Sequence, residues 1–193
     1  YGDTAAVVVA VGSAKTREKI VTAIKRIGDF QFPNLIDPDV QLSQFVSLGQ
    51  GNIICAGNIL TVNVCLQDFV ILNLSCTVGH DAHLESFVTV YPGVNISGNV
   101  RIGERAELGT GSQIIQGITI GQDTIMGAGG AVVGHIQSPC VAVGVPANPI
   151  RILGGGYTGF LIVGNSGHGE VIKDIGRGCR RYYRKGTYAG VPG

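Results

Sequence analysis

An aliphatic residue recurs at every sixth position through the centre of the chain, from Ile36 to Val132. A helical period of 3.6 or 3.5 residues cannot keep this register over about a hundred residues, so an α-helix and a coiled coil are excluded. A short strand followed by a turn can keep it, and three such hexads close one triangular coil. Residues 35–153 are therefore predicted to form a left-handed parallel β-helix. The seventeen positions are Ile36, Leu42, Leu48, Ile54, Leu60, Leu66, Leu72, Val78, Leu84, Val90, Ile96, Ile102, Leu108, Ile114, Ile120, Met126 and Val132.

The residues around each aliphatic position support this mainly β fold. The large side chain is expected to point into the prism, with a small or β-branched residue four positions later at the corner. Glycine, at 31 of 193 residues, often follows the aliphatic residue, as at Gly79 and Gly103, where it is predicted to relieve the turn. At ~4.8 Å per coil the prism is roughly 27 Å tall. Its flat faces favour association of several prisms side by side.

The flanking segments predict a small Rossmann-like α/β domain in two parts, residues 1–34 and residues 160–193. In the first part, residues 5–12 (AAVVVAVG) are predicted to form a buried parallel strand, because they are continuously apolar and end in glycine. Residues 15–27 have helical spacing, with Ser13 as the expected N-cap.

The second part repeats this pattern. Residues 160–163 and residues 170–175 predict a strand and a helix joined by the glycine turn of residues 164–169. Such a turn can bind a phosphate, although a tight βα turn without a ligand is an alternative. Residues 154–159 are the expected glycine-rich linker to the prism.

Composition excludes several classes of protein. The net charge is +1, so no general electrostatic attraction to nucleic acid is expected, and the longest apolar run has seven residues, too few to span a membrane. The five cysteines are scattered without a metal-ligand spacing, which indicates buried thiols and no metal site. We expect a cytoplasmic protein.

Several motifs together give the chain a resemblance to a known family. It resembles the sugar O- and N-acyltransferases of the sialic acid O-acetyltransferase type, and most of all the N-acetyltransferases of nucleotide-linked 4-amino sugars (bacillosamine type). This resemblance implies an acetyl-CoA cosubstrate, a nucleotide sugar acceptor and a homotrimer. The motifs are residues 162–169 (IVGNSGHG), residues 10–13 (AVGS) with Arg17, residues 32–36 (FPNLI), residues 79–81 (GHD), residues 97–100 (SGNV) and residues 143–147 (VGVPA) with Arg151.

The order of these motifs differs from that of the family. The glycine-rich strand and helix open the chain in the family but here follow residues 154–156, so the sequence resembles a circular permutation, and the family's strand ending in paired acidic residues is missing. The nine residues 151–159 reach at most about 30 Å, hardly more than the height of the prism. Either the final segment docks on another subunit, or the order is not that of one continuous native chain.

The resemblance places the chemistry at His80 and Asp81. A sugar amine or hydroxyl needs a general base to become a good nucleophile, and His is suited to this near neutral pH. His80 is the expected base and Asp81 its orienting partner, with backbone N–H groups near Gly98 stabilising the oxyanion and no covalent enzyme intermediate. By its residues alone, His80 is an ordinary turn histidine. His83 is the rival base, and His135 is expected to be structural.

The resemblance also implies the two binding sites. The family's second histidine, which meets the thioester, falls at Thr89. The cosubstrate is expected in the cleft between two prisms, with its pantetheine arm along the backbone. Small residues such as Gly127 and Ala128 admit close approach there, although an ordinary hexad corner also explains them. Arg151 either meets a phosphate or is a solvated charge. The implied cosubstrate-binding residues are Thr89, Gly98, Thr110, Gly127, Ala128 and Arg151, and the implied acceptor-binding residues are Gly12, Ser166, Gly167 and His168.

Three alternatives to sugar N-acetylation remain. The first is O-acetylation of sialic acid or a related sugar. The second is a non-catalytic β-helix scaffold that has lost its acceptor pocket. The third is a γ-type carbonic anhydrase, which needs three zinc-binding histidines, whereas only His80 and His83 lie close in this sequence.

Overall fold

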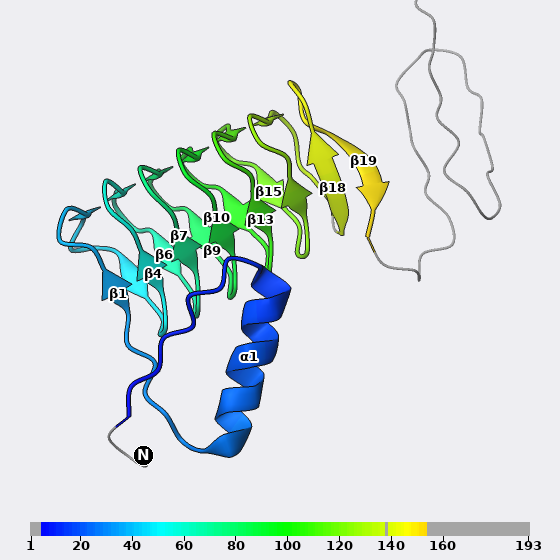
Figure 1. The fold of residues 1–193 in the computed structure, drawn as a ribbon. Coiled ribbons are helices and arrows are strands. Elements are labelled where there is room, and N and C mark those ends of the chain that lie inside the picture. Colours follow the sequence, from blue (N-terminus) through cyan, green and yellow to red (C-terminus); the bar gives the residue numbers. More distant parts are fainter. Residues whose placement is uncertain (1–4, 138, 154–193) are drawn as a thin grey trace, which may run out of the picture. The chain divides into compact units, whose positions relative to one another are not determined.

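The computed structural model describes residues 5–137 and 139–153 (Figure 1). Within these residues no helix is long and apolar enough to cross a membrane. The predicted linker at residues 154–159 and the strand, glycine turn and helix predicted in residues 160–193 lie outside the described residues. The predicted acceptor-binding residues Ser166, Gly167 and His168 also lie outside the described residues. The same is true of the segment whose position in the chain suggested a circular permutation.

The described chain is a solenoid of three parallel sheets, which we call sheets I, II and III. Each of the seventeen predicted aliphatic residues is the second residue of a two-residue strand, so the predicted β-helix is confirmed. Residues 18 apart pair in register on neighbouring coils, as Thr77 does with Asn95.

The strands follow in spatial order. Sheet I contains β1 (Leu35–Ile36), β4 (Ile53–Ile54), β7 (Ile71–Leu72), β10 (Thr89–Val90), β13 (Glu107–Leu108), β16 (Ile125–Met126), β18 (Cys140–Val143) and β19 (Asn148–Ile152), of which the last is antiparallel. Sheet II contains β17 (Ala131–Val132), β14 (Gln113–Ile114), β11 (Asn95–Ile96), β8 (Thr77–Val78), β5 (Ile59–Leu60) and β2 (Gln41–Leu42). Sheet III contains β15 (Thr119–Ile120), β12 (Arg101–Ile102), β9 (His83–Leu84), β6 (Cys65–Leu66) and β3 (Ser47–Leu48).

The core lies inside the prism. The inward aliphatic residues of the central coils, such as Leu72, Leu84 and Ile102, are completely buried. Burying such a side chain stabilises the fold by about 1.5–3 kcal/mol. From β4 to β17 the buried second residue of each strand therefore holds the solenoid together, while the first residue lies on the outer face.

The predicted role of the glycines that follow the aliphatic residues is wrong. The left-handed conformation occurs three positions after the aliphatic residue instead, at residues that include Gly57 and Asp81. A Cβ atom on Gly79 would lie 2.6 Å from the backbone nitrogen of Gly98, one coil further on. Gly79 therefore permits the close approach of successive coils and does not relieve a turn.

Helix α1 (Ala14–Ile27) confirms the predicted helix and lies along the corner between sheets III and I. Ser13 stands at the N-cap but makes no side-chain capping bond. The Ala14 N–H instead donates to Glu107 Oε1 of β13 at 3.0 Å. A side chain distant in sequence therefore caps the helix.

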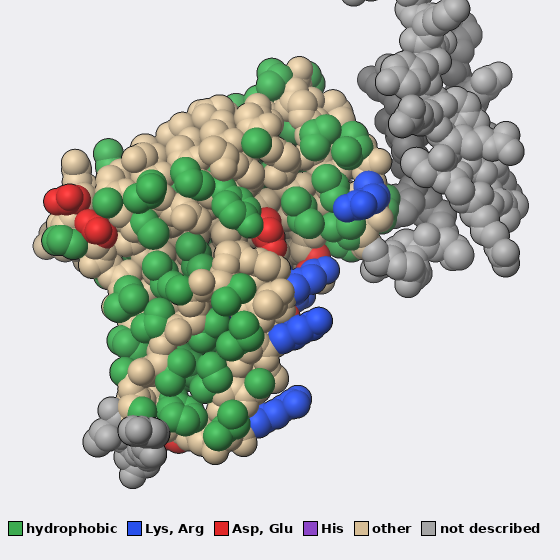
Figure 2. Space-filling model, in the orientation of Figure 1, with side chains coloured by type: hydrophobic (Ala, Val, Ile, Leu, Met, Phe, Trp, Pro, Cys, Tyr) green, Lys and Arg blue, Asp and Glu red, His purple; other side chains and the backbone are tan. Residues whose placement is uncertain are grey.

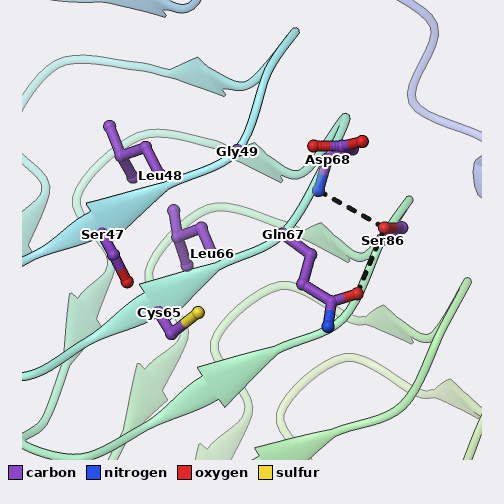
Figure 3. A pocket seen from close by; sticks show the side chains of 8 residues that line it. All are labelled: Ser47, Leu48, Gly49, Cys65, Leu66, Gln67, Asp68 and Ser86. Atoms are coloured by element: carbon purple, nitrogen blue, oxygen red, sulfur yellow. Dashed lines mark hydrogen bonds between the residues drawn. The ribbon is translucent and has the colours of Figure 1, made fainter.

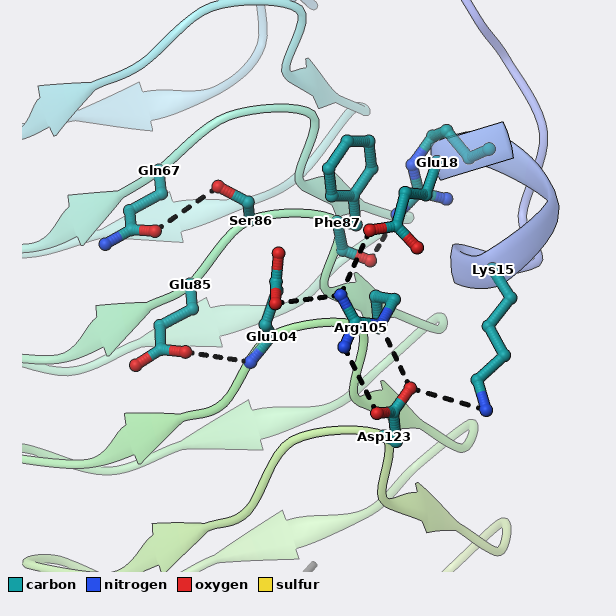
Figure 4. Close-up of polar contacts among 10 residues, drawn as sticks. Lys15, Glu18, Gln67, Glu85, Ser86, Phe87, Glu104, Arg105 and Asp123 are labelled. Carbon is teal, nitrogen blue, oxygen red and sulfur yellow. Dashed lines mark hydrogen bonds and ion pairs between the residues drawn. The ribbon is translucent and has the colours of Figure 1, made fainter. Parts of the chain in front are cut away.

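Ion pairs fasten the first turns of α1 to the prism (Figure 4). Arg105 donates to both carboxylate oxygens of Asp123, at 3.0 and 3.2 Å, and to Glu18 of α1 at 3.1 Å. Lys15 approaches Asp123 at 3.4 Å. Along the exposed side of the helix Figure 2 shows a row of cationic side chains.

The predicted strand at residues 5–12 is wrong. Apart from one bridge between Ala6 and Gln31 the segment has no strand pairing among the described residues, and Val9 is its only buried side chain there. A strand needs a neighbouring strand to pair with along its length, and among the described residues only Gln31 forms a bridge with this segment. The described part of the expected α/β domain is thus a helix and an extended segment.

Candidate active site

His80 and Asp81 stand together at the corner between sheets II and III. His80 Nδ1 and Asp81 Oδ2 are 2.8 Å apart, and Asn63 Nδ2 donates to Asp81 Oδ1 at 3.2 Å. Asp81 adopts a left-handed conformation (φ 58°), and both side chains are about half exposed. Because a carboxylate only accepts, Nδ1 carries the proton, and Nε2 of a neutral ring then has a free lone pair.

The electrostatics of this pair match its geometry. The hydrogen bond from His80, followed by the bond from Asn63, lowers the pKa of Asp81 below its ordinary value. The carboxylate is therefore ionised at neutral pH.

Gly98 lies directly against the imidazole, one coil above His80. A Cβ atom on Gly98 would lie 2.5 Å from His80 Cε1 and 2.8 Å from His80 Cδ2, and closer still to Nε2. The structure thus brings Gly98 together with His80 and Asp81. Its absent side chain makes room for the ring, a role that sequence reasoning missed although the spacing of 18 residues signals it.

The other two described histidines lie elsewhere. His83 is on the outer face of sheet III, where its Nε2 is 3.2 Å from Gln67 Nε2. His135 Nδ1 accepts from the Thr119 N–H at 3.0 Å, as its predicted structural role requires.

A shallow groove of about 350 Å³ runs over sheet III near Cys65 and Gln67 (Figure 3). No predicted site residue lines this groove. Its lining residues are Ser47, Leu48, Gly49, Cys65, Leu66, Gln67, Asp68 and Ser86.

Thr89 and Gly12 meet on the outer face of sheet I. Thr89 is fully buried, and its hydroxyl donates to the Gly12 carbonyl at 2.7 Å and accepts from Arg17 Nη2 at 2.9 Å. Arg17 Nη1 also donates to the carbonyls of Val11 and Gly12, at 2.6 and 3.1 Å. The loop at Gly12, which the resemblance assigns to the acceptor, is therefore tied to the prism at Thr89.

Arg17 is a buried cation whose partners are almost all carbonyl groups. Burial lowers its pKa to about 10, while nearby Glu107 opposes this effect, so the guanidinium is charged at neutral pH. It donates to the carbonyls of Phe69 and Phe87 at 2.9 and 2.6 Å. Arg17 therefore joins α1, the loop at Gly12 and two coils.

Thr110, Gly127 and Ala128 lie together at the corner between sheets I and II. Thr110 and Ala128 are 18 residues apart, and a Cβ atom on the adjacent Gly109 would lie 2.7 Å from the Ala128 nitrogen. One side of the triangle is six residues long and spans up to about 20 Å. Within one protomer these three residues and His80 therefore lie at different corners of the prism. Arg151 is exposed on β19, beside Val141.

Sequence reasoning also missed Tyr91 and Glu107. The Tyr91 hydroxyl donates to Glu107 Oε2 at 3.2 Å, beside the loop at Gly12. Only the placement of both residues beside sheet I signals this pair. Among the described residues no group of three His, Cys, Asp or Glu side chains could hold a metal ion.

Known proteins were compared with the chain as a whole. No protein-family model matches it. Among curated proteins, GDP-perosamine N-acetyltransferase of Escherichia coli O157:H7 is 28% identical over 121 residues, which cover 63% of this chain and 54% of the relative. Serine acetyltransferase of Mycobacterium tuberculosis is 32% identical over 81 residues, which cover 38% of this chain and 35% of the relative. The chain thus spans about half or less of these curated relatives.

Solved structures give longer matches. PerB from Caulobacter crescentus, in complex with CoA and GDP-perosamine, has a TM-score of 0.73 and 36% identity over 75% of this chain and 70% of PerB. The acetyltransferase domain of PglB from Neisseria gonorrhoeae has a TM-score of 0.72 and 38% identity over 74% of this chain and 69% of that domain. The chain therefore belongs to the perosamine- and bacillosamine-type N-acetyltransferases.

Proposed function

We propose that this protein acetylates the amine of a nucleotide-linked amino sugar, with acetyl-CoA as the acetyl donor and His80 as the general base. One observation carries the proposal: His80 is held through Nδ1 by Asp81 while its ring lies over the bare backbone of Gly98. The related PerB binds both CoA and GDP-perosamine, and PglB binds acetyl-coenzyme A.

The chemistry follows from the free nitrogen of His80. Nε2 of His80 takes a proton from the sugar amine while the amine nitrogen attacks the carbonyl carbon of the thioester. The C–N bond forms, the C–S bond breaks, and the proton passes from the imidazolium to the departing thiolate. Asp81 orients the ring and stabilises its charged form, and backbone N–H groups near Gly98 are the proposed oxyanion donors.

A homotrimer would complete the active site. The outer face of sheet II separates the His80 corner from the Thr110 corner, and its outward residues are uncharged. They form a hydrogen-bonded ladder in which Thr77 donates to Asn95 and Asn95 to Gln113, at 2.7 and 3.1 Å.

Apolar side chains flank this face. Along the His80 corner, Phe45, Val62, Ile115 and Val133 are 41–60% exposed. Three prisms presenting sheet II to a common axis would bury these side chains. The same arrangement would bring the His80 corner of one protomer to the Thr110 corner of the next.

Two variants test the proposed base. With acetyl-CoA and GDP-perosamine as probes, His80→Ala should lower kcat by about 10²- to 10⁴-fold and leave acetyl-CoA binding intact. His83→Ala, three residues away on sheet III, is the matched control and should keep full activity. Turnover by His80→Ala equal to that of the wild type would refute the assignment.

Binding and mass measurements separate the alternatives. Calorimetry that detects acetyl-CoA binding but no nucleotide-sugar binding would favour the scaffold. An alkali-labile acetyl product would indicate O-acetylation. Light scattering should give three times the mass of the chain, and a monomer with full activity would contradict the composite site.

A further inference from the structure

The hydroxyl of Tyr91 lies between the prism and the loop at Gly12. Tyr91 directly follows β10 and is half-buried. Its hydroxyl donates to Glu107 Oε2 at 3.2 Å. A Cβ atom on Gly12 would lie 3.8 Å from the Tyr91 hydroxyl oxygen. The proposed function gives this hydroxyl no role.

Glu107 determines the polarity of that hydroxyl. Its other oxygen accepts from the Ala14 N–H at 3.0 Å, so the carboxylate is held on both sides. A carboxylate only accepts, so the phenol directs its proton to Glu107 and leaves its own lone pairs for an incoming donor. Such a chain of hydrogen bonds strengthens the phenol oxygen as an acceptor. Burial, and then Glu107, raise the pKa of Tyr91, so the phenol keeps its proton at neutral pH.

Tyr91 ends a column of glycines. Gly109 and Gly127 occupy the same corner position one and two coils further on. A Cβ atom on Gly109 would lie 2.5 Å from the Met126 carbonyl oxygen, and one on Gly127 would lie 2.7 Å from Val143 Cγ1. Gly109 is therefore packed against the backbone of the next coil and Gly127 against Val143, and Tyr91 is the first of the three positions to carry a side chain.

The axial position of Tyr91 matches that of His80. At ~4.8 Å per coil of 18 residues, Tyr91 is about 3 Å further along the axis than His80. On the same scale Thr110 is about 8 Å and Ala128 about 13 Å beyond His80. In a trimer with its axis along the prisms, Tyr91 would thus stand nearer than Thr110 or Ala128 to the level of a neighbour's His80, where the proposed function puts the acyl end.

The resemblance assigns Thr89 to the acyl end of the cosubstrate, but the Thr89 hydroxyl already has hydrogen-bond partners within the protein. The Thr89 hydroxyl is fully buried, donates to Gly12 and accepts from Arg17. Tyr91 is the next hydroxyl along the same edge of sheet I, and it is not completely buried.

We propose that Tyr91, polarised by Glu107, binds the acyl end of acetyl-CoA by accepting the N–H of the terminal pantetheine amide. That amide is two carbons from the sulfur, so fixing it aligns the thioester. The assignment rests on the proposed function and deepens it. Glu107 acts through Tyr91 and is a positioning residue.

Calorimetry on the full chain tests the assignment. Tyr91→Phe should weaken CoA and acetyl-CoA binding by about three- to tenfold, the effect of one net hydrogen bond, and leave GDP-perosamine binding unchanged. Ser47→Ala, which removes an exposed hydroxyl from sheet III, is the matched control and should change neither affinity. The double variant Tyr91→Phe, Glu107→Gln should have the same CoA affinity as the single variant that binds CoA more weakly, because Glu107 acts through Tyr91.

A cosubstrate analogue tests the same contact without a mutation in the protein. An acetyl-CoA analogue with an ester oxygen in place of the terminal amide N–H should bind the wild type as weakly as Tyr91→Phe binds acetyl-CoA, and should bind both proteins equally. Equal CoA affinity of the wild type and Tyr91→Phe would overturn this assignment alone, as would a loss confined to GDP-perosamine. Failure of the wild type to bind CoA would overturn the proposed function as well.

Discussion

Substitution of Gly98 by alanine should separate activity from stability. The added Cβ atom would lie 2.5 Å from His80 Cε1, whereas ordinary van der Waals contact begins at 3.4 Å. The clash is with a half-exposed side chain, which can swing into solvent. The backbone is therefore expected to stay where it is, while the imidazole ring of His80 is displaced.

The magnitude follows from this displacement. The ring must retreat by about 1 Å, and a misplacement of this size can cost on the order of 10²-fold in rate. The retreat also strains the 2.8 Å contact between His80 Nδ1 and Asp81. We expect kcat to fall about 10²-fold, while the free energy of unfolding changes by less than about 0.5 kcal/mol.

Gly79→Ala is the matched control, because there the new methyl group meets backbone. Its Cβ atom would lie 2.6 Å from the Gly98 nitrogen and from the Ser97 carbonyl carbon, and neither atom can turn away. Overpacking of this kind costs about 1–3 kcal/mol, to be measured by urea unfolding. The reasoning is refuted if Gly98→Ala keeps more than half of the wild-type kcat, or if it destabilises the fold as much as Gly79→Ala.

Two further predictions concern Asp81 and Arg17. Asn63→Ala removes the second donor to Asp81 and should raise the pKa of that carboxyl towards its ordinary value, measured by NMR titration. Because the folded-state pKa of Asp81 is depressed, the stability from its ionised form is lost only as pH falls through that pKa, and Asn63→Ala should move this loss to higher pH. An unshifted titration would show that Asn63 is not a partner in solution. Arg17→Met leaves buried carbonyls without donors and should destabilise the protein by about 2–4 kcal/mol in urea unfolding. A loss below about 1 kcal/mol would mean that water replaces the guanidinium.

Parts of the candidate site were predictable from the sequence. His80 and Asp81 are neighbours in sequence at a corner, so their contact follows once the hexads are recognised. Gly98 lies 18 residues from His80, and this spacing predicts that the two residues stack. The partners of Thr89 were not predictable, because Gly12 and Arg17 reach it only through the docking of α1.

The sequence by itself determined the prism and the helix. A strict period of six specifies which side chains point inward, and each coil contacts only its neighbours, so local rules decide every strand from β1 to β17. Only the tertiary structure decided the rest. Residues 5–12 form no strand without partners, and the role of Gly79 depends on the distance to the next coil. Glu107 caps α1 because the helix packs against the prism. These features arise from contacts between segments distant in the chain, which no local period specifies.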